Sequence, residues 1–330
     1  MKKIIVIALM CAMVSGAAFA AGGQSGGAAS ADNYPSKPVT AMVAWAPGGG
    51  GELVFRALAE VFQKHTGQPI VIVNKGEAAG VPGIMDFKQN AKPDGYDIMH
   101  WNAAHVIKTH MDPVPFTGTE FTAVCQVVLS NNFLAVKSDS KWKTLADYIA
   151  DAKANPGQIS IGNAGAGGGN HFGAILFEKA AGIQLKHIPF AGGGPAVTGT
   201  LTGDCQSVMA NPPEGASQVQ AGQLRVLALF GDKRSDAFPG VSTGKELGVN
   251  FSMSHWRGVV APAGLPAPIL AKMEKIFKQC IEDPVFVKRM DSLGSTPAFT
   301  DGKTYAQIVA NDDKMYEAII KENKMGNRYK

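Results

Sequence analysis

The first stretch with a chemical role to consider is a run of four glycines, Gly48–Gly51, between Pro47 and Glu52. A β-favouring apolar run, Val39–Trp45, precedes it, and a pattern with helical spacing begins at Glu52. A glycine turn between a strand and a helix exposes free backbone N–H groups at the positive end of the helix dipole. The stretch therefore predicts a site for an anion, which can approach the backbone closely because glycine has no Cβ.

The same arrangement recurs along the chain, so that at least five predicted strands end in a Gly- or Asn-rich loop. These loops are Pro47–Gly51, Lys75–Gly83, Trp101–Ala104, Asn163–His171, Ala191–Ala196 and Asn211–Pro213. Strands that alternate with helices indicate an α/β fold with mostly parallel sheets. Ligands of such sheets bind outside the carboxyl ends of the strands, so we expect these loops to face one cleft.

The length of 330 residues, with 45% hydrophobic and 18% charged residues, predicts about two domains with real cores. Two β-favouring runs, Phe121–Ser130 and Asn132–Ser138, read together as one strand that crosses between the domains, and Ser254–Ala261 reads as the strand that crosses back. We expect a first lobe over residues 34–131 and 254–330 and a second lobe over residues 132–253.

The N-terminus reads as an export signal. Lys2 and Lys3 precede the apolar run Ile4–Met13, and Ala18–Ala20 supplies small residues for cleavage after Ala20. The run is too short to span a membrane. Cys11 lies within it, but the residues before this cysteine make a poor lipoprotein signal, so no lipid anchor is expected.

Residues 21–33 are rich in Gly, Ala and Ser and are expected to form a flexible leader. Residues 1–20 contain two lysines and no acidic residue, so their removal lowers the net charge from +4 to +2. This small charge gives no reason to expect nucleic acid as a partner. The mature protein is expected to be exported to the periplasm and monomeric.

Known catalytic and cofactor patterns are missing from the sequence. It has no G-x-x-x-x-G-K-[ST], no G-x-S-x-G and no complete dinucleotide fingerprint, and its histidines lack the spacing of a metal site. The remaining cysteines, Cys125, Cys205 and Cys280, fit either buried thiols or one disulfide and a free thiol. We expect no enzyme, no cofactor and no metal, but a reversible binder whose neutral N–H donors, rather than an arginine, hold an anion.

Seven segments in register over some 265 residues resemble the periplasmic solute-binding proteins of tripartite tricarboxylate transporters, the Bug or TctC-like family. They are Tyr34–Val39, Pro47–Arg56, Asn74–Gly83, Lys92–Asp97, Ala152–Gly157, Pro189–Ala196 and Trp256–Pro266. The resemblance implies a two-lobed binding-protein fold, type II-like, whose lobes close on a ligand. It also implies a carboxylate held by backbone amides and ordered water of the first two loops, and delivery to a two-subunit membrane permease.

The chain departs from the family pattern at several loop positions. Trp101 adds aromatic surface where small residues are common. Five other positions differ from the usual residue: this chain has Glu52 in place of Asp, Asn163 and Gly168 in place of Ser, Ala191 in place of Lys and Gln206 in place of Asp. These differences remove hydroxyl groups and a positive charge from the loops, or exchange an acidic residue. We therefore expect a ligand with fewer charges than citrate, either a mono- or a dicarboxylate, with an apolar or aromatic body.

The predicted ligand-binding residues come from the loops of both lobes. They are Pro47, Gly48, Gly49, Gly50, Glu52, Ala79, Gly80, Val81, Trp101, Asn102, Asn163, Gly167, Gly168, His171, Phe190, Gly193 and Asn211. The backbone amides of Gly48–Gly50 and Ala79–Val81 are expected to hold the carboxylate.

Structural roles stay open for several of these side chains. Glu52 either complements the start of its helix or contacts the ligand. His171 packs at a helix start or faces the ligand, and Trp101 forms a wall of the site or packs between the lobes. Trp256 is assigned to the hinge core. Two other functions also stay open: a ligand sensor for a signalling partner, and an exported enzyme on the same fold.

Overall fold

The computed structural model describes residues 31–235 and 237–329. The predicted signal peptide, its cleavage site after Ala20, Cys11 and residues 21–30 of the predicted leader lie outside this part of the chain. The last three residues of that leader form a short 3-10 helix, η1 (Ala31–Asn33), rather than an irregular segment. Within the described residues, no helix combines the length and the apolar character that crossing a membrane requires.

The strands follow one path in the order β2-β1-β3-β9-β4-β7-β5-β6, and β8 and β10 also pair with β4. Their bounds are β1 (Val39–Val43), β2 (Ile70–Asn74), β3 (Asp97–Asn102), β4 (Thr122–Lys137), β5 (Ser160–Asn163), β6 (Lys186–Pro189), β7 (Ser207–Ala210), β8 (Leu224–Phe230), β9 (Ser254–Ala261) and β10 (Thr296–Asp301). The pairs β1–β2, β1–β3, β5–β6 and β5–β7 are parallel, whereas β4 and β9 pair antiparallel with their neighbours.

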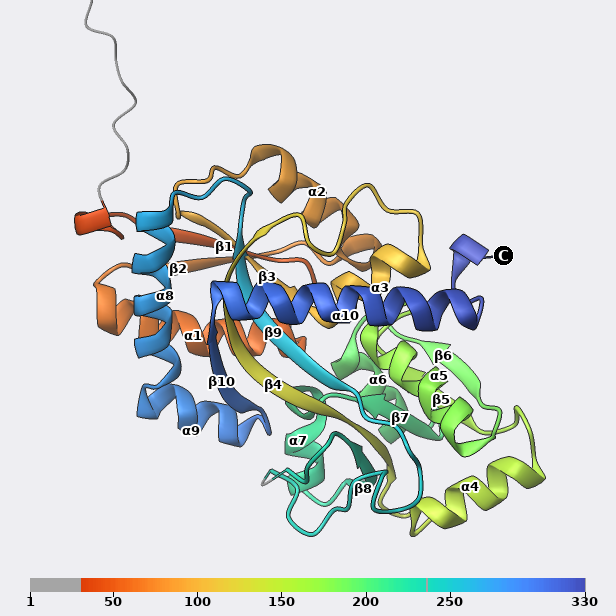
Figure 1. The fold of residues 1–330 in the computed structure, drawn as a ribbon. Helices are drawn as coiled ribbons and strands as arrows, with labels where there is room; N and C mark the ends of the chain where they lie inside the picture. The colour runs from red at the N-terminus through yellow and green to blue at the C-terminus, as the bar shows by residue number, and fades with distance from the viewer. Residues whose placement is uncertain (1–30, 236, 330) are drawn as a thin grey trace, which may run out of the picture.

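Helices follow most of the strands, which confirms the predicted α/β class. They are α1 (Gly50–Thr66), α2 (Val81–Asn90), α3 (Ala103–Met111), α4 (Leu145–Ala154), α5 (Gly169–Ala181), α6 (Gly193–Thr202), α7 (Pro212–Gln220), α8 (Ala267–Ile281), α9 (Pro284–Ser292) and α10 (Gly302–Glu322), with the 3-10 helices η2 (Glu77–Gly80) and η3 (Asn327–Tyr329). Figure 1 shows α10 lying across the molecule beside α3.

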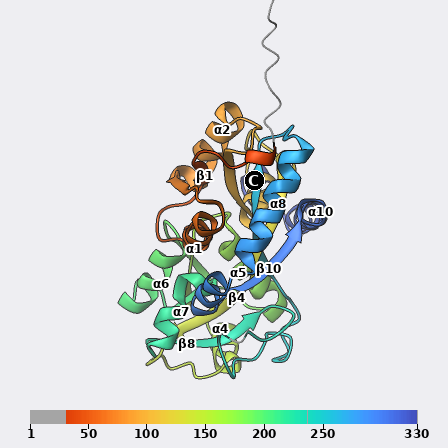
Figure 2. The same cartoon turned by 90° about the vertical axis from the view of Figure 1, so that its left-hand side faces the viewer.

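The long strand β4 joins two groups of strands. Its first part, up to Asn131, pairs with β9 and β10, and its second part, from Asn132, pairs with β7 and β8. We call β2, β1, β3, β9 and β10 the first arm, and β8, β7, β5 and β6 the second arm. Figures 1 and 2 show the two arms at opposite ends of the molecule, with β4 running from one to the other.

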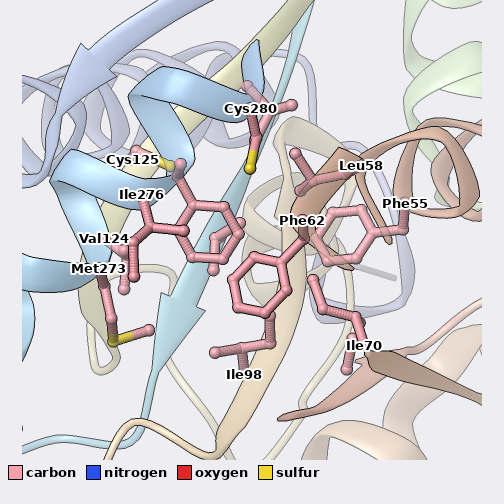
Figure 3. Close-up of a cluster of buried hydrophobic side chains, with 14 of the residues drawn as sticks. Phe55, Leu58, Phe62, Ile70, Ile98, Val124, Cys125, Met273, Ile276 and Cys280 are labelled. Atoms are coloured by element: carbon pink, nitrogen blue, oxygen red, sulfur yellow. The ribbon is translucent and has the colours of Figure 1, made fainter. Parts of the chain in front are cut away.

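Each arm is covered on both faces by an apolar cluster. In the first arm, α1, α8 and α9 cover one face, where Phe62 lies 5.6 Å from Phe277, and α2, α3 and α10 cover the other. Figure 3 shows α1 and α8 meeting over this core, with Cys125 and Cys280 among its side chains. Cys125, Cys205 and Cys280 are all buried and free, which fits the buried-thiol alternative.

The runs at 121–138 form the single strand β4, as expected. The structure differs from the expected elements at two places. One is β10, an additional strand. Trp101–Ala104, expected as a loop, ends β3 and begins the helix α3 instead. Asn102 caps this helix: its Oδ1 accepts from the His105 N–H at 3.2 Å, and the His105 Nδ1 accepts from the Asn102 N–H at 3.3 Å. Such reciprocal bonds satisfy donors that a helix start leaves free.

Candidate functional site

A cavity of about 120 Å³ lies where the carboxyl ends of β1, β3, β5, β6 and β7 meet. Loops from both arms therefore line it, as parallel strands with glycine loops predict. Its lining residues are Trp45, Ala46, Pro47, Gly49, Gly50, Gly51, Asn102, Ala104, Ala164, Gly168, Gly169, Asn170, Ala191, Gly192, Gly193, Pro195, Asn211, Glu214, His255 and Arg257.

A wider hollow of about 710 Å³, which we call the vestibule, adjoins the cavity. The two share Trp45, Ala46, Pro47, Ala164 and Ala191. The loop after β2 contributes Asn74 and Gly76–Ala78 to the vestibule only, and the loop after β6 contributes Phe190. Trp45 and Phe190 are the aromatic residues of the vestibule lining among the described residues.

Three helices begin at the cavity without a side-chain cap. The residues that precede them are Gly49 for α1, Gly168 for α5 and Gly192 for α6, and none has a side chain that could accept the free N–H groups. The first N–H groups of a helix have no partner inside it, and their dipoles favour an anion. The cavity therefore brings together the donors that an acid group needs.

Arg257 brings a positive charge into this cavity, which the sequence interpretation missed. It is 2% exposed, its Nη1 donates to the Ser130 Oγ at 3.2 Å, and its Nε is buried without a partner. Its guanidinium forms no ion pair with a carboxylate of the described residues, and Arg257 is the only Lys or Arg of the cavity lining there. The lining of the cavity therefore includes an arginine in addition to the expected neutral N–H donors.

The alternation of β9 explains why Arg257 and His255 face the cavity. Side chains two residues apart in a strand point to the same face, and the residue between them points to the other. His255 and Arg257 accordingly line the cavity, whereas the Trp256 Nε1 donates to the Asp312 Oδ2 of α10 at 2.6 Å. Strand β9 lies between β3 and β4, with Arg257 opposite Asn102, and this holds the guanidinium beside the start of α1.

Burial lowers the pKa of Arg257, and the charge of Glu214 raises it in part. An ideal Cβ built on Gly50 would lie 3.0 Å from the Arg257 Nη2 and 3.6 Å from the Glu214 Cγ. Both groups therefore flank the first turn of α1. A buried cation without an ion-pair partner is costly, and an acid group that enters the cavity would offset this cost.

Seven of the predicted residues line the cavity: Pro47, Gly49, Gly50, Asn102, Gly168, Gly193 and Asn211. Phe190 lines the vestibule. Gly48 lies at the turn before them, where its N–H donates to the Glu52 Oε2 at 2.6 Å and its φ is 80°. Four lining residues with polar side chains were not predicted: Asn170, Glu214, His255 and Arg257. Only His255 and Arg257 could have been predicted, because strand alternation places both of them on the face opposite Trp256.

Several predicted residues support the loops instead of lining the cavity. The Glu52 carboxylate, besides its bond to Gly48, accepts from the Arg56 Nε at 2.6 Å. The Asn163 Oδ1 accepts from the Gly165 N–H at 3.1 Å, and the His171 Nδ1 accepts from the Gly167 N–H at 3.0 Å. These bonds fix the glycine turns, so Glu52 and His171 take the structural alternatives left open for them.

Two predictions need correction. Trp101 is 1% exposed and belongs to the apolar cluster under α3 and α10; its Nε1 donates to the Gly118 O at 3.1 Å, so it forms no wall of the cavity. Gly80 and Val81, at the end of η2 and the start of α2, are described in the structure and line neither hollow. Gly80 packs behind the end of β1, where an added Cβ would lie 2.2 Å from the Ala44 O.

Neutral histidines lie beneath the cavity. An ideal Cβ on Gly51 would lie 2.7 Å from the His100 ring, and one on Gly169 would lie 2.2 Å from the His255 ring. Burial lowers the pKa of His105 to about 3, and burial together with the charge of Arg257 lowers the pKa of His255 to about 3. The rings therefore stay uncharged at neutral pH and give the helix starts a rigid support.

We expect the free energy of unfolding to fall as the pH drops from 7 to 5. The unfolded chain binds protons at histidines near pH 6.5, whereas His105 and His255 stay neutral in the fold until about pH 3. Each such group removes about 1.4 kcal/mol of stability per pH unit below that range. Urea unfolding at pH 7, 6 and 5 measures the slope, and His255→Gln should reduce it; a flat profile would contradict the neutral state of these rings.

Comparison with known proteins shows which protein family the chain resembles. Residues 54–325 of the chain match the family described as "Tripartite tricarboxylate transporter family receptor". A protein of Cupriavidus necator, the UPF0065 protein in the gbd 5′ region, is 33% identical over 300 residues, which cover 89% of this chain and 90% of that protein. The protein BugT of Bordetella pertussis is 28% identical over 298 residues, 89% of this chain and 91% of its own.

Solved structures share the fold. A periplasmic transporter structure has a TM-score of 0.85 at 28% identity, and the periplasmic binding protein BugD has 0.82 at 27%; each match covers 89% of this chain and 99% of the other. The structure of Rhodopseudomonas palustris MatC, solved with malate, has a TM-score of 0.79 at 22% identity, and the match covers 87% of this chain and 100% of the MatC chain. At this identity the similarity shows the fold alone.

Proposed function

The chain belongs to the tripartite tricarboxylate transporter receptor family, and on this premise we propose that it captures a small carboxylate in the periplasm and delivers it to a membrane permease. The family and its structural relatives are solute-binding proteins and not enzymes. Export to the periplasm, the carboxylate and the two-subunit permease are parts of the proposal.

The observation that carries the proposal is the Arg257 guanidinium, which forms no ion pair within the described residues, beside the uncapped start of α1. An acid group placed between them would accept charge-assisted hydrogen bonds from the guanidinium and from the N–H groups of Gly50 and Gly51. Such bonds contribute about 1.5–3 kcal/mol each, enough for a specific but reversible complex.

The size of the cavity favours one acid group with a modest body. A volume of about 120 Å³ leaves little room for three carboxylates, whereas the adjoining vestibule, whose lining includes Trp45 and Phe190, has room for an apolar or aromatic body. Malate is the ligand in the MatC structure named above, which has the same fold. We therefore favour a mono- or dicarboxylate with fewer charges than citrate.

Closure of two lobes on the ligand is part of the same proposal. The change of β4 partners between Asn131 and Asn132 supports a division into residues 34–131 with 254–330 and residues 132–253. Because loops of both arms line the cavity, a bound ligand would contact both lobes and shift a hinge equilibrium toward the closed state.

The proposal predicts that the purified protein carries or binds such an acid. Mass spectrometry of small molecules released from the protein should detect a carboxylate. Isothermal titration of the emptied protein should then give a stronger response to mono- and dicarboxylates with apolar bodies than to citrate. Tight citrate binding without a response to monocarboxylates would refute the ligand class, and no response to any carboxylate would refute the receptor function.

A further inference from the structure

We propose that the ligand is a zwitterion, an amino acid whose carboxylate binds between Arg257 and the start of α1 and whose ammonium group binds at Glu214. This inference rests on the proposed receptor function and narrows its ligand class. It follows from the opposite charges that the two arms bring into one cavity.

Glu214 occupies the anion site that the second arm would otherwise offer. Its Oε2 accepts from the Asn211 N–H at 2.8 Å and from the Asn170 Nδ2 at 2.9 Å. An ideal Cβ on Gly193 would lie only 1.9 Å from the Glu214 Cδ, so the carboxylate lies directly against the start of α6. The starts of α6 and α7 therefore face an acid that belongs to the protein itself, and they do not need one from the ligand.

The side of the cavity around Glu214 consequently accepts hydrogen bonds. Among residues 31–235 and 237–329, no donor contacts the Glu214 Oε1. The Asn211 Nδ2, from a residue of the same lining, donates to the Asn170 Oδ1 at 2.7 Å, which leaves the Glu214 Oε1 as the free acceptor among the described residues on this side. A hydrogen-bond donor of the ligand, such as an ammonium group, would satisfy the Glu214 Oε1.

The opposite side of the cavity donates hydrogen bonds. Within the part of the chain that the structure describes, the Arg257 Nε has no partner and no side chain caps the start of α1. The Arg257 Nη2 and the Glu214 Cγ both lie within 4 Å of the ideal Cβ position of Gly50. A donor side and an acceptor side this close suit two opposite charges on neighbouring ligand atoms. The side chain of an amino acid held in this way would extend toward Trp45 and the vestibule.

The same charges disfavour a dicarboxylate in the cavity. Its second carboxylate would face Glu214 at short range, and two like charges in a desolvated site repel each other. A monocarboxylate would satisfy Arg257 but leave the Glu214 Oε1 without a donor. Leaving buried polar groups unpaired lowers affinity strongly.

The test compares matched ligands by isothermal titration of the full chain. L-Norvaline, pentanoate and glutarate share a five-carbon backbone and differ in their second charged group; further apolar L-amino acids and their des-amino acids extend the panel. We expect an L-amino acid to bind at least about tenfold more tightly than its des-amino acid and than the dicarboxylate. Equal or tighter binding of pentanoate or glutarate would overturn this inference but leave the receptor function standing, whereas no binding of any carboxylate would contradict both.

The variant Glu214→Gln isolates the contribution of the carboxylate. Its amide oxygen can still accept from the Asn211 N–H, so the start of α7 keeps its bond. We expect the amino acid to lose its preference and the dicarboxylate to gain affinity. The control, Glu60→Gln, changes an exposed acid of α1 outside the cavity and should leave the ranking unchanged. An unchanged preference in Glu214→Gln would overturn the inference.

Discussion

Arg257→Gln is expected to weaken carboxylate binding by about 100-fold, because it removes the only Lys or Arg of the cavity lining within the described residues. The unliganded protein is expected to keep or gain thermal stability, since the wild-type guanidinium is 2% exposed and has no ion-pair partner. Isothermal titration measures the first effect, and thermal unfolding without ligand measures the second.

The matched control is Arg225→Gln. Arg225 belongs to β8, donates to the Trp142 O at 3.3 Å, and lies outside the cavity lining. The Arg225→Gln variant should bind the ligand with the affinity of the wild type. If both variants keep wild-type affinity, the carboxylate does not bind at Arg257, and the role assigned to this residue fails.

Gly76→Ala is expected to lower the free energy of unfolding by about 3 kcal/mol and to weaken binding as well. An ideal Cβ at Gly76 would lie 2.2 Å from the Ala46 N and 2.5 Å from the Trp45 C. Both are backbone atoms, so no side chain can rotate away, and the loop after β1 must move. Because Trp45 and Ala46 line both the cavity and the vestibule, this movement changes the site.

Urea unfolding and isothermal titration of the same preparation measure both effects. The control is Gly194→Ala, where the nearest atom to an added Cβ is the Gly48 O at 3.9 Å, so its stability should match the wild type. Equal stability of Gly76→Ala and Gly194→Ala would show that the loops after β1 and β2 are not packed as closely as described.

The glycine loops were predictable because their signals are local. The strand before Gly48 and the helix after it both follow from residues next to them in the chain, and the bonds of Glu52 and Asn163 lie within the same turns. These signals identified the loops that line the cavity and the α/β class. They also placed α5, whose last residues lead to the left-handed Gly182.

The charged groups of the cavity were not predictable from the sequence, because their positions depend on pairing between distant segments. Arg257 reaches the start of α1 only because β9 pairs with β3, about 155 residues earlier. Glu214 reaches Gly193 only because α6 and α7 pack against each other. The prediction for Trp101 failed for a related reason. Strand alternation places this side chain on the face opposite His100, toward α10.

A crystal structure of the protein saturated with its tightest ligand tests the central claim most directly. We predict a carboxylate within hydrogen-bond distance of the Arg257 guanidinium and of the N–H groups of Gly50 and Gly51. A ligand acid group bound elsewhere, with Arg257 turned to form an ion pair with Glu214, would contradict the account.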